Sequence, residues 1–198
     1  MVAGRIGKLI AAALEAVEEH GPGVGMGRIA ERAGIPRPHV YRYFKDKDEL
    51  DAEVAKVATA DLAGVLRPVL SVNGTTSEII TQVVATLVGW AGEHPQLFRF
   101  VAAQPGAREE LQRELLSTFA GYVSEAGLEA EVPPAGVAAV IGMGHAGIGW
   151  WLDHHDETQE QVTTRLSRYA TLIVQDFGAR AGLAIPDDMV FTAPASRS

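Results

Sequence analysis

One segment, residues 28–47, concentrates side chains that bind anions. It combines cationic, imidazole and phenol side chains with a proline: Arg28, Arg37, Pro38, His39, Tyr41, Arg42, Tyr43, Lys45 and Lys47. Guanidinium, ammonium and phenol groups donate hydrogen bonds to phosphate oxygens, and arginine also pairs bidentately with guanine. We therefore expect this segment to contact DNA through these residues.

Two short helices joined by a tight turn must position these side chains. The first helix is marked by apolar residues at helical spacing: Met26, Ile29, Ala30 and Ala33. Gly34 follows where this helix must end, because glycine adopts the left-handed conformation without strain. A second short helix begins near Arg37, with Val40 and Phe44 as apolar anchors. This outline predicts a helix-turn-helix whose second helix enters the major groove, with Arg37 and His39 at the base edges.

The same spacing also fits an ordinary αα-hairpin inside a helical core. The second helix argues against that alternative, because it is short and polar at its start, where Arg37, His39 and Arg42 lie. A core helix would present a continuous apolar stripe instead.

The segment from Ile29 to Leu50 resembles the DNA-binding domain of the TetR family of transcriptional regulators. The resemblance rests on Ile29-Ala30, Ala33-Gly34, Tyr41, Tyr43-Phe44 and Lys47-Asp48-Glu49-Leu50. This chain departs from the family pattern at four positions, Gly25, Pro36, Pro38 and His39. The family has serine, threonine or small residues there. The resemblance implies an all-α fold of about nine helices, with a three-helix DNA-binding head and a helical body for ligand binding and dimerisation.

The charge is divided unequally along the chain. The 198 residues carry a net charge of −8, but residues 1–47 hold 8 Lys/Arg against 5 Asp/Glu. Residues 48–198 hold 9 against 20, so the basic charge gathers in the segment that would face phosphate. The sequence has no cysteine, which is typical of a reducing compartment. Because glutamates interrupt the apolar N-terminal run, we expect a helix there rather than a secretory signal, and a cytoplasmic protein.

Turn residues and helical periodicity divide the remaining chain into further helices. The expected ranges are 5–20, 47–66, 75–94, 95–103, 107–126, 132–152 and 158–180. Thr75 and Glu78 have the spacing of a capping box at the start of one of them. We expect a helix-turn-helix domain over 1–47, a ligand-sensing and dimerisation domain over 48–181, and a loose tail over 182–198.

Residues 132–152 contain no formal charge and place small residues on one face of the expected helix. The length would span a bilayer, but five glycines and the lack of a basic flank argue against this, and we expect no membrane partner. The resembling family dimerises through its last two long helices, so the resemblance implies a homodimer. The implied interface comprises Ala139, Gly142, Ala146, Val162, Leu166, Tyr169, Ile173 and Phe177.

The resemblance also implies a cavity in the body for a small-molecule effector. Aromatic and apolar walls would suit an effector that is itself largely apolar. The implied lining comprises Trp90, His94, Phe98, Phe119, Tyr122, Met143 and Trp150. Core packing alone would also account for most of these residues.

Two other motifs suggest different chemistry. Gly142, Gly144 and Gly147 have the spacing of a dinucleotide-binding loop, but such a loop opens a βαβ unit and no strands are expected here. The run Asp-His-His-Asp at 153–156 contains metal-ligating types, but adjacent residues of a helix point in different directions. We therefore expect no catalytic residue, no metal and no cofactor.

We expect a DNA-binding transcriptional regulator, most simply a ligand-relieved repressor that acts as a homodimer on a pseudo-palindromic operator. Its expected partners are operator DNA, a small-molecule effector and a second copy of the chain. Two alternatives remain open: a dinucleotide-binding enzyme that uses the motif from Gly142 to Gly147, and a helical module that binds another protein.

Overall fold

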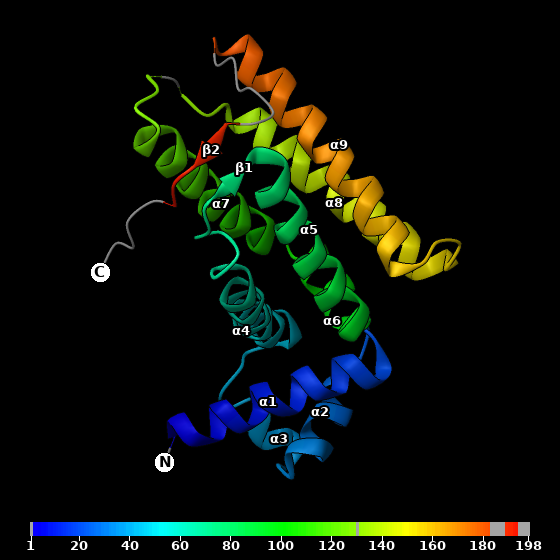
Figure 1. Cartoon of the computed structure of the whole chain (residues 1–198). Coiled ribbons are helices and arrows are strands. Elements are labelled where there is room, and N and C mark those ends of the chain that lie inside the picture. The colour runs from blue at the N-terminus through cyan, green and yellow to red at the C-terminus, as the bar shows by residue number, and fades with distance from the viewer. Residues whose placement is uncertain (1, 130, 183–188, 194–198) are drawn as a thin grey trace. The chain divides into compact units, whose positions relative to one another are not determined.

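The computed structural model of the chain describes residues 2–129, 131–182 and 189–193. Within these residues it contains nine helices and one short two-stranded ribbon, which confirms the expected all-α fold (Figure 1). The elements are α1 (Val2–His20), α2 (Met26–Ala33), α3 (Arg37–Val40), α4 (Lys47–Leu66), β1 (Gly74–Thr75), α5 (Thr76–Glu93), α6 (Pro95–Ala103), α7 (Pro105–Glu125), α8 (Pro134–His154), α9 (Gln159–Arg180) and β2 (Val190–Phe191).

The chain folds into two compact units, which we call the head and the body. The head comprises Met1–Asp61 and His94–Ala107, and the body comprises Leu62–Glu93 and Arg108–Ser198. This division differs from the expected domain boundary after residue 47. Most of α4 and all of α6 belong to the head, so the chain passes between the two units three times.

The head has a single apolar core that is built by α1, α2, α3, α4 and α6. Its largest fully buried side chains include Leu9, Ile29, Val40, Leu50 and Phe100. Phe100 comes from α6, fifty residues beyond Leu50 along the chain. Burial of such side chains is the main force that holds the small helices together, since helices as short as α3 are not stable alone in water.

In the body, α9 packs against both α5 and α8, and α8 and α9 lie side by side (Figure 1). The contact between α8 and α9 is close because α8 lacks side chains where it meets its neighbour. A Cβ atom added at Gly147 would lie 2.5 Å from Leu166 Cδ2, and one at Gly136 would lie 2.9 Å from the Phe177 ring. Gly136 and Gly147 of α8 therefore serve packing within the chain.

Local sequence signals define the start of α5 as expected. The backbone N–H of Thr75 donates to Glu78 Oε2 at 2.9 Å, and the N–H of Glu78 donates to Thr75 Oγ1 at 3.3 Å. This reciprocal pair is the predicted capping box. The hydrogen bonds from Thr75 also lower the pKa of the Glu78 carboxyl group.

The expectation of a loose C-terminal tail is wrong for residues 189–193. Strand β2 pairs antiparallel with β1, with Gly74 opposite Phe191 and Thr75 opposite Val190. Phe191 is buried against Ile79 and Tyr122, and burial of this large apolar ring explains why the segment is held against the body. Residues 183–188 and 194–198 lie outside the described residues.

Helix α8 is long and apolar enough to cross a bilayer when only length and composition are considered, and 28% of its apolar window is buried in the fold. No other helix among the described residues meets those two conditions.

The close contact at Gly147 leads to a stability prediction with an internal control. Gly144 lies on the same helix, and a Cβ atom added there would meet no atom within 4 Å. Gly144→Ala should stabilise the protein by up to about 1 kcal/mol through helix propensity. Gly147→Ala gains the same propensity but meets the buried Leu166, so it should be less stable than Gly144→Ala by about 1–3 kcal/mol. Urea unfolding of both variants measures this difference, and equal stabilities would contradict the packing argument.

Candidate nucleic-acid interface and body cavity

The turn between α2 and α3 is fixed by backbone hydrogen bonds around Gly34. This residue has φ 63° and ψ 33°, a left-handed conformation that favours glycine. Its N–H donates to Glu31 O at 3.0 Å, and the N–H of Ile35 donates to Ala30 O at 3.0 Å. These two bonds satisfy the last carbonyl groups of α2 and set the angle at which the chain leaves it.

Helix α3 is short and is held by apolar anchors on one side. Pro36 precedes the helix and Pro38 lies in its first turn, where the missing N–H would have had no helical partner. The N–H of Phe44 still donates to Val40 O at 3.1 Å, so a helical turn continues beyond the end of α3. Val40 and Phe44 are both buried in the head core. The polar residues between them are consequently directed outward.

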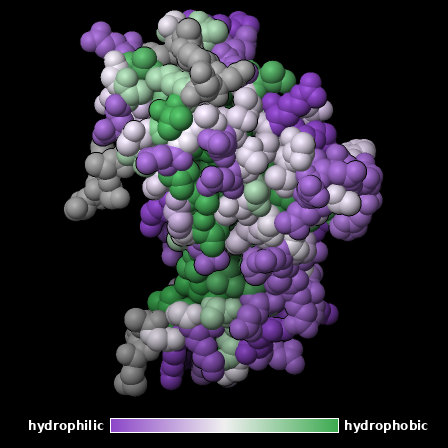
Figure 2. Space-filling model, in the orientation of Figure 1, coloured by the Kyte–Doolittle hydropathy of each residue, from purple (hydrophilic) through white to green (hydrophobic). Residues whose placement is uncertain are grey.

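Most residues predicted to contact DNA are exposed on the head. The exposed ones are Arg28, Arg37, Pro38, His39, Tyr41, Arg42 and Lys45, and the half-buried ones are Tyr43 and Lys47. Arg37 Nη2 lies 3.5 Å from the Tyr41 hydroxyl oxygen, so the start of α3 and the residue after it form one polar surface. Hydrophilic side chains dominate the outer surface of the helix-turn-helix on the side shown in Figure 2.

The two lysines of this surface differ in their surroundings. The Lys47 side chain is 26% exposed and its ammonium group pairs with Asp51 one turn later on α4. The Lys45 side chain is 88% exposed. A phosphate would have to share the Lys47 ammonium group with Asp51, whereas Lys45 projects into solvent beside Asp46. Lys45 is therefore the better placed phosphate ligand.

A further arginine joins the surface from α1. Arg5 Nη1 donates to the Tyr43 hydroxyl oxygen at 3.3 Å, and this hydrogen bond raises the pKa of the Arg5 guanidinium group. Arg32, in contrast, is turned toward α1, where it forms ion pairs with Glu15 and Glu19. These contacts fix α2 against α1 and leave Arg5 beside the predicted DNA-binding residues.

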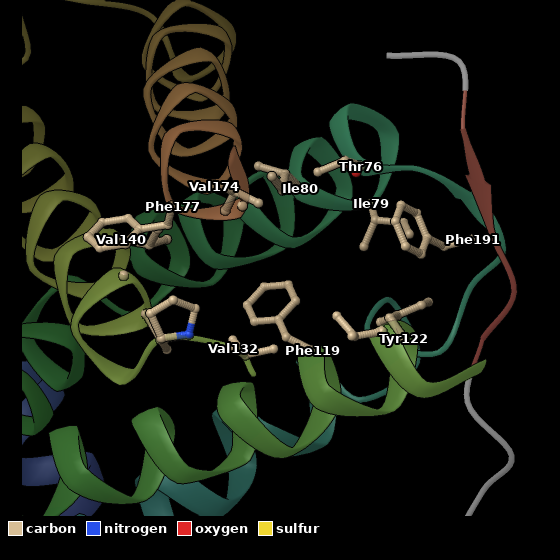
Figure 3. A pocket seen from close by; sticks show the side chains of 15 residues that line it. Thr76, Ile79, Ile80, Phe119, Tyr122, Val132, Val140, Val174, Phe177 and Phe191 are labelled. Carbon is tan, nitrogen blue, oxygen red and sulfur yellow. The ribbon is translucent and has the colours of Figure 1, made fainter. Parts of the chain in front are cut away.

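The body contains an apolar cavity of about 100 Å³ (Figure 3). Its walls come from the start of α5, the end of α7, the start of α8, the end of α9 and strand β2.

Two of the residues predicted to bind an effector, Phe119 and Tyr122, line this cavity. The Tyr122 hydroxyl group donates to Val72 O at 2.7 Å, with Leu70 O also in reach at 3.1 Å, and accepts from Val72 N at 3.2 Å. Burial raises the pKa of the Tyr122 phenol, so it is neutral at physiological pH. Its polar atom serves the loop between α4 and β1, and its ring faces the cavity.

The other five predicted effector residues lie elsewhere. Phe98 is buried in the head, Trp90 is buried in the body, and Met143 is half-buried on α8. His94 Nδ1 lies 3.9 Å from Glu18 Oε2 of α1. Trp150 is 55% exposed, and its Nε1 donates to Asp156 Oδ2 at 3.0 Å. None of these five lines the cavity, and a ligand-binding role for them stays a prediction.

Sequence reasoning missed most of the cavity wall. The residues it missed are Thr76, Ile79, Ile80, Val123, Val132, Pro133, Gly136, Val137, Val140, Val174, Phe177, Gly178 and Phe191, of which only Phe177 had been singled out, as a dimer contact. These residues come from five separate segments, and no local signal in the sequence shows that the segments meet.

The predicted dimer interface is divided between exposed and buried residues. Ala139, Gly142, Ala146 and Tyr169 are exposed. Ile173 and Phe177 are half-buried. Val162 and Leu166 are fully buried against the chain's own helices. A side chain without exposed surface has nothing to offer a partner, so the prediction is wrong for these two.

The structure contradicts the dinucleotide-binding alternative. Gly142, Gly144 and Gly147 all lie inside α8, a continuous helix, and no strand precedes them directly. The fingerprint requires a turn between a strand and a helix, so that backbone N–H groups can face a pyrophosphate. The Asp-His-His-Asp run ends the same helix: His155 adopts φ 50°, and His154 stacks on Trp150 at 3.6 Å between ring centroids.

Comparisons with known proteins agree with this geometry. Residues 9–54 match the sequence profile of a family described as "Bacterial regulatory proteins, tetR family". An uncharacterized HTH-type transcriptional regulator of Mycobacterium tuberculosis is 25% identical over 169 residues, which cover 80% of this chain and 72% of that protein. Residues 9–54 therefore form a helix-turn-helix segment of the TetR type, and most of the chain is similar to HTH-type transcriptional regulators.

Solved structures of TetR-type proteins share its fold. A tetR-family transcriptional regulator from Streptomyces coelicolor has a TM-score of 0.69 and 23% identity, and the match covers 91% of this chain and 84% of that one. The transcriptional regulator FadR from Bacillus subtilis, solved in complex with stearoyl-CoA, has a TM-score of 0.64 and 14% identity, and the match covers 84% of this chain and 96% of that one. These likenesses show that the fold is shared, including the arrangement of the helical body.

The surroundings of the two lysines lead to a prediction for DNA binding by this protein. Lys45→Ala should weaken binding to all DNA sequences alike and reduce the slope of log affinity against log salt by about one unit. Lys47→Ala should reduce the slope less, because Asp51 already neutralises that ammonium group. Affinity measured over a series of salt concentrations tests both. An effect of Lys45→Ala confined to one operator sequence would count against a phosphate contact.

Proposed function

We propose that this protein is a ligand-relieved repressor of the TetR type that binds a pseudo-palindromic operator in the cytoplasm as a homodimer. The observation that carries the proposal is the short helix α3, which is anchored by Val40 and presents Arg37 and His39 outward at its start. In helix-turn-helix docking, the first residues of the second helix reach base edges in the major groove. A regulator that binds DNA in this way acts most simply by occupying its operator.

The proposed dimer forms through an exposed surface of the last two helices, which we call the α8–α9 face. Its members are Ala139, Gly142, Ala146, Trp150, Tyr169 and Leu172. The three large ones are unusually accessible for apolar residues: Trp150 is 55% exposed, Leu172 54% and Tyr169 44%. Large apolar side chains exposed on one pair of helices are typical of a protein interface. The small residues beside it allow a partner helix to approach closely.

A two-fold dimer explains how four-residue recognition helices can specify a site. Each head alone offers few base contacts, but a dimer places two heads on half-sites about 34 Å, one turn of DNA, apart. Arg37 can bond guanine O6 and N7 bidentately, a contact that contributes about 1–3 kcal/mol of discrimination. Two symmetric copies double that contribution.

The proposed route from ligand to DNA runs through α6. This helix lies between α5 and α7 in the chain, and both of those helices supply walls of the body cavity. Helix α6 itself packs on α1, where Glu18 accepts hydrogen bonds from Gln96 N at 3.4 Å and Leu97 N at 3.3 Å. A ligand that prefers a different arrangement of α5 and α7 would move α6 and thereby the head, which shifts the population away from DNA binding.

The known ligand complex of FadR from Bacillus subtilis supports a ligand-binding body, because that protein shares this fold. Among the described residues, no group of three or more His, Cys, Asp or Glu is arranged to hold a metal. A helical module that binds another protein remains the main rival. A gel shift with DNA from upstream of the protein's own gene separates the two, since only a regulator retards that DNA.

Base reading by Arg37 and His39 gives a testable prediction. In a binding-site selection, Arg37→Ala and His39→Ala should each relax the base preference at one or two symmetric positions of each half-site. Lys45→Ala is the matched control, because its exposed side chain should affect affinity but not preference. If the selected motif is unchanged and affinity falls uniformly, these two residues contact only phosphate.

The proposed α8–α9 face gives a second prediction. Gly142 is exposed, and a Cβ atom added there would meet no other atom of this chain within 4 Å. The protomer therefore tolerates a larger residue at this position, whereas a partner helix packed against it would be overpacked. Gly142→Leu should weaken dimerisation by about 1–3 kcal/mol per site. Gly144→Leu, on the same helix but outside the α8–α9 face, is the control. Sedimentation equilibrium measures the monomer–dimer constant, and a monomeric unmutated protein at micromolar concentration would refute the dimer.

A further inference from the structure

The body cavity has no means of binding a charged ligand. Apart from Thr76 and Tyr122, every residue that lines it is aliphatic, aromatic, proline or glycine. The Tyr122 hydroxyl group is already engaged by the backbone of Leu70 and Val72. In Figure 3 the side chains of Val140, Phe119 and Ile79 line the space from three different helices. An ionised group in this space would lose its hydration without gaining a partner.

The volume of the cavity limits the size of what it can hold. A dry apolar cavity of about 150 Å³ in another protein accommodates benzene. The present cavity, at about 100 Å³, is of the same order, and it is partly open to solvent. One small ring fits, and a short substituent can extend through the opening.

One wall of the cavity comes from the C-terminal segment. Phe191 of β2 is buried, and its ring meets that of Tyr122 edge to face at 6.3 Å between centroids. The strand itself is only two residues long, paired with β1 and followed by one further bond from Ala193 N to Asn73 Oδ1 at 2.8 Å. Strand β2 is thus a short wall with few backbone contacts, whereas the other walls lie in long helices or directly before α8.

We propose that the cavity binds a neutral, largely apolar molecule about the size of one substituted benzene ring, and that β2 with Phe191 is the wall that moves to admit it. The effector role of this molecule rests on the proposed function, but its binding does not. The chemistry excludes carboxylates, phosphates and amines as the part of a ligand that enters the cavity. It favours a hydrocarbon ring or a small neutral arene, which gains by leaving water.

The test uses the full-length protein and toluene as the probe, with benzoate as a charged probe of similar shape. Saturation-transfer NMR and calorimetry should show saturable binding of toluene and binding of benzoate that is weaker by at least about tenfold. Absence of toluene binding, or equal affinity for benzoate, would overturn the proposal.

Variants show whether the probe occupies this cavity. Val140→Phe fills the space from α8 and should abolish toluene binding, and Ile80→Phe fills it from α5 if the first variant does not fold. Val57→Phe introduces the same bulk at an exposed position of α4 and should leave binding unchanged. Undiminished binding in both folded filling variants would place the probe elsewhere and overturn the assignment.

The moving wall has its own readout. Phe191→Ala removes the ring that closes the cavity, so exchange of toluene on and off the protein should accelerate by at least about tenfold relative to the unmutated protein. An unchanged exchange rate would overturn this part of the proposal. A gel shift with toluene distinguishes binding in the cavity from the effector role of the bound molecule. If toluene binds without releasing DNA, the cavity binds the ligand but the effector role is contradicted. If a charged compound releases DNA and toluene does not bind, the proposed repressor function is supported and the cavity assignment is overturned.

Discussion

The attachment of α6 to α1 is the contact on which the organisation of this protein depends. Glu18 places a carboxylate at the N-terminus of α6, where the first backbone N–H groups have no helical acceptor and the helix dipole favours negative charge. Phe100 then completes the apolar core of the head from the same helix. Without this contact, α6 would be a loose connection between α5 and α7. With it, the two helices that wall the body cavity are tied to the DNA-binding unit.

This arrangement explains why a small change in the body can matter for DNA recognition. The recognition helix α3 is only four residues long, so its position depends on α1 and α2 rather than on its own stability. Arg32 and its two glutamate partners fix α2 to α1, and Glu18 fixes α1 to α6. In the proposed mechanism, a ligand acts by favouring a different position of α6, and these contacts pass the change on to α1, α2 and α3.

The sequence predicted those features that local chemistry determines. Gly34, the limits of α4 and the Thr75–Glu78 capping box all depend on residues a few positions apart, and the structure has them as expected. The predicted DNA-binding residues all lie in one short segment, residues 28–47. The sequence could not predict which surface of a helix meets which partner. The resemblance implied that the stripe containing Val162 and Leu166 lies at a dimer interface. Periodicity reveals only that a face is buried, and not what buries it.

Most of the cavity wall and the C-terminal strand were missed for a related reason. Their residues come from segments separated by as many as 115 positions, such as Thr76 and Phe191, and each segment alone is an ordinary apolar stretch. Likewise, α8 carries five glycines that look equivalent in the sequence, yet Gly136 and Gly147 accommodate Phe177 and Leu166 whereas Gly142 is exposed. Only the fold distinguishes glycines that pack within the chain from one that is available to a second chain.

Hydroxyl-radical footprinting of operator DNA, combined with the mass of the complex, tests the central claim most directly. The claim is that two copies of the chain bind one operator through two heads related by two-fold symmetry. It predicts an even number of chains per operator and two protected regions whose centres lie about one helical turn, or slightly more, apart. A single chain on the operator with one protected region would contradict the claim. So would the absence of any protection of upstream DNA by the folded protein.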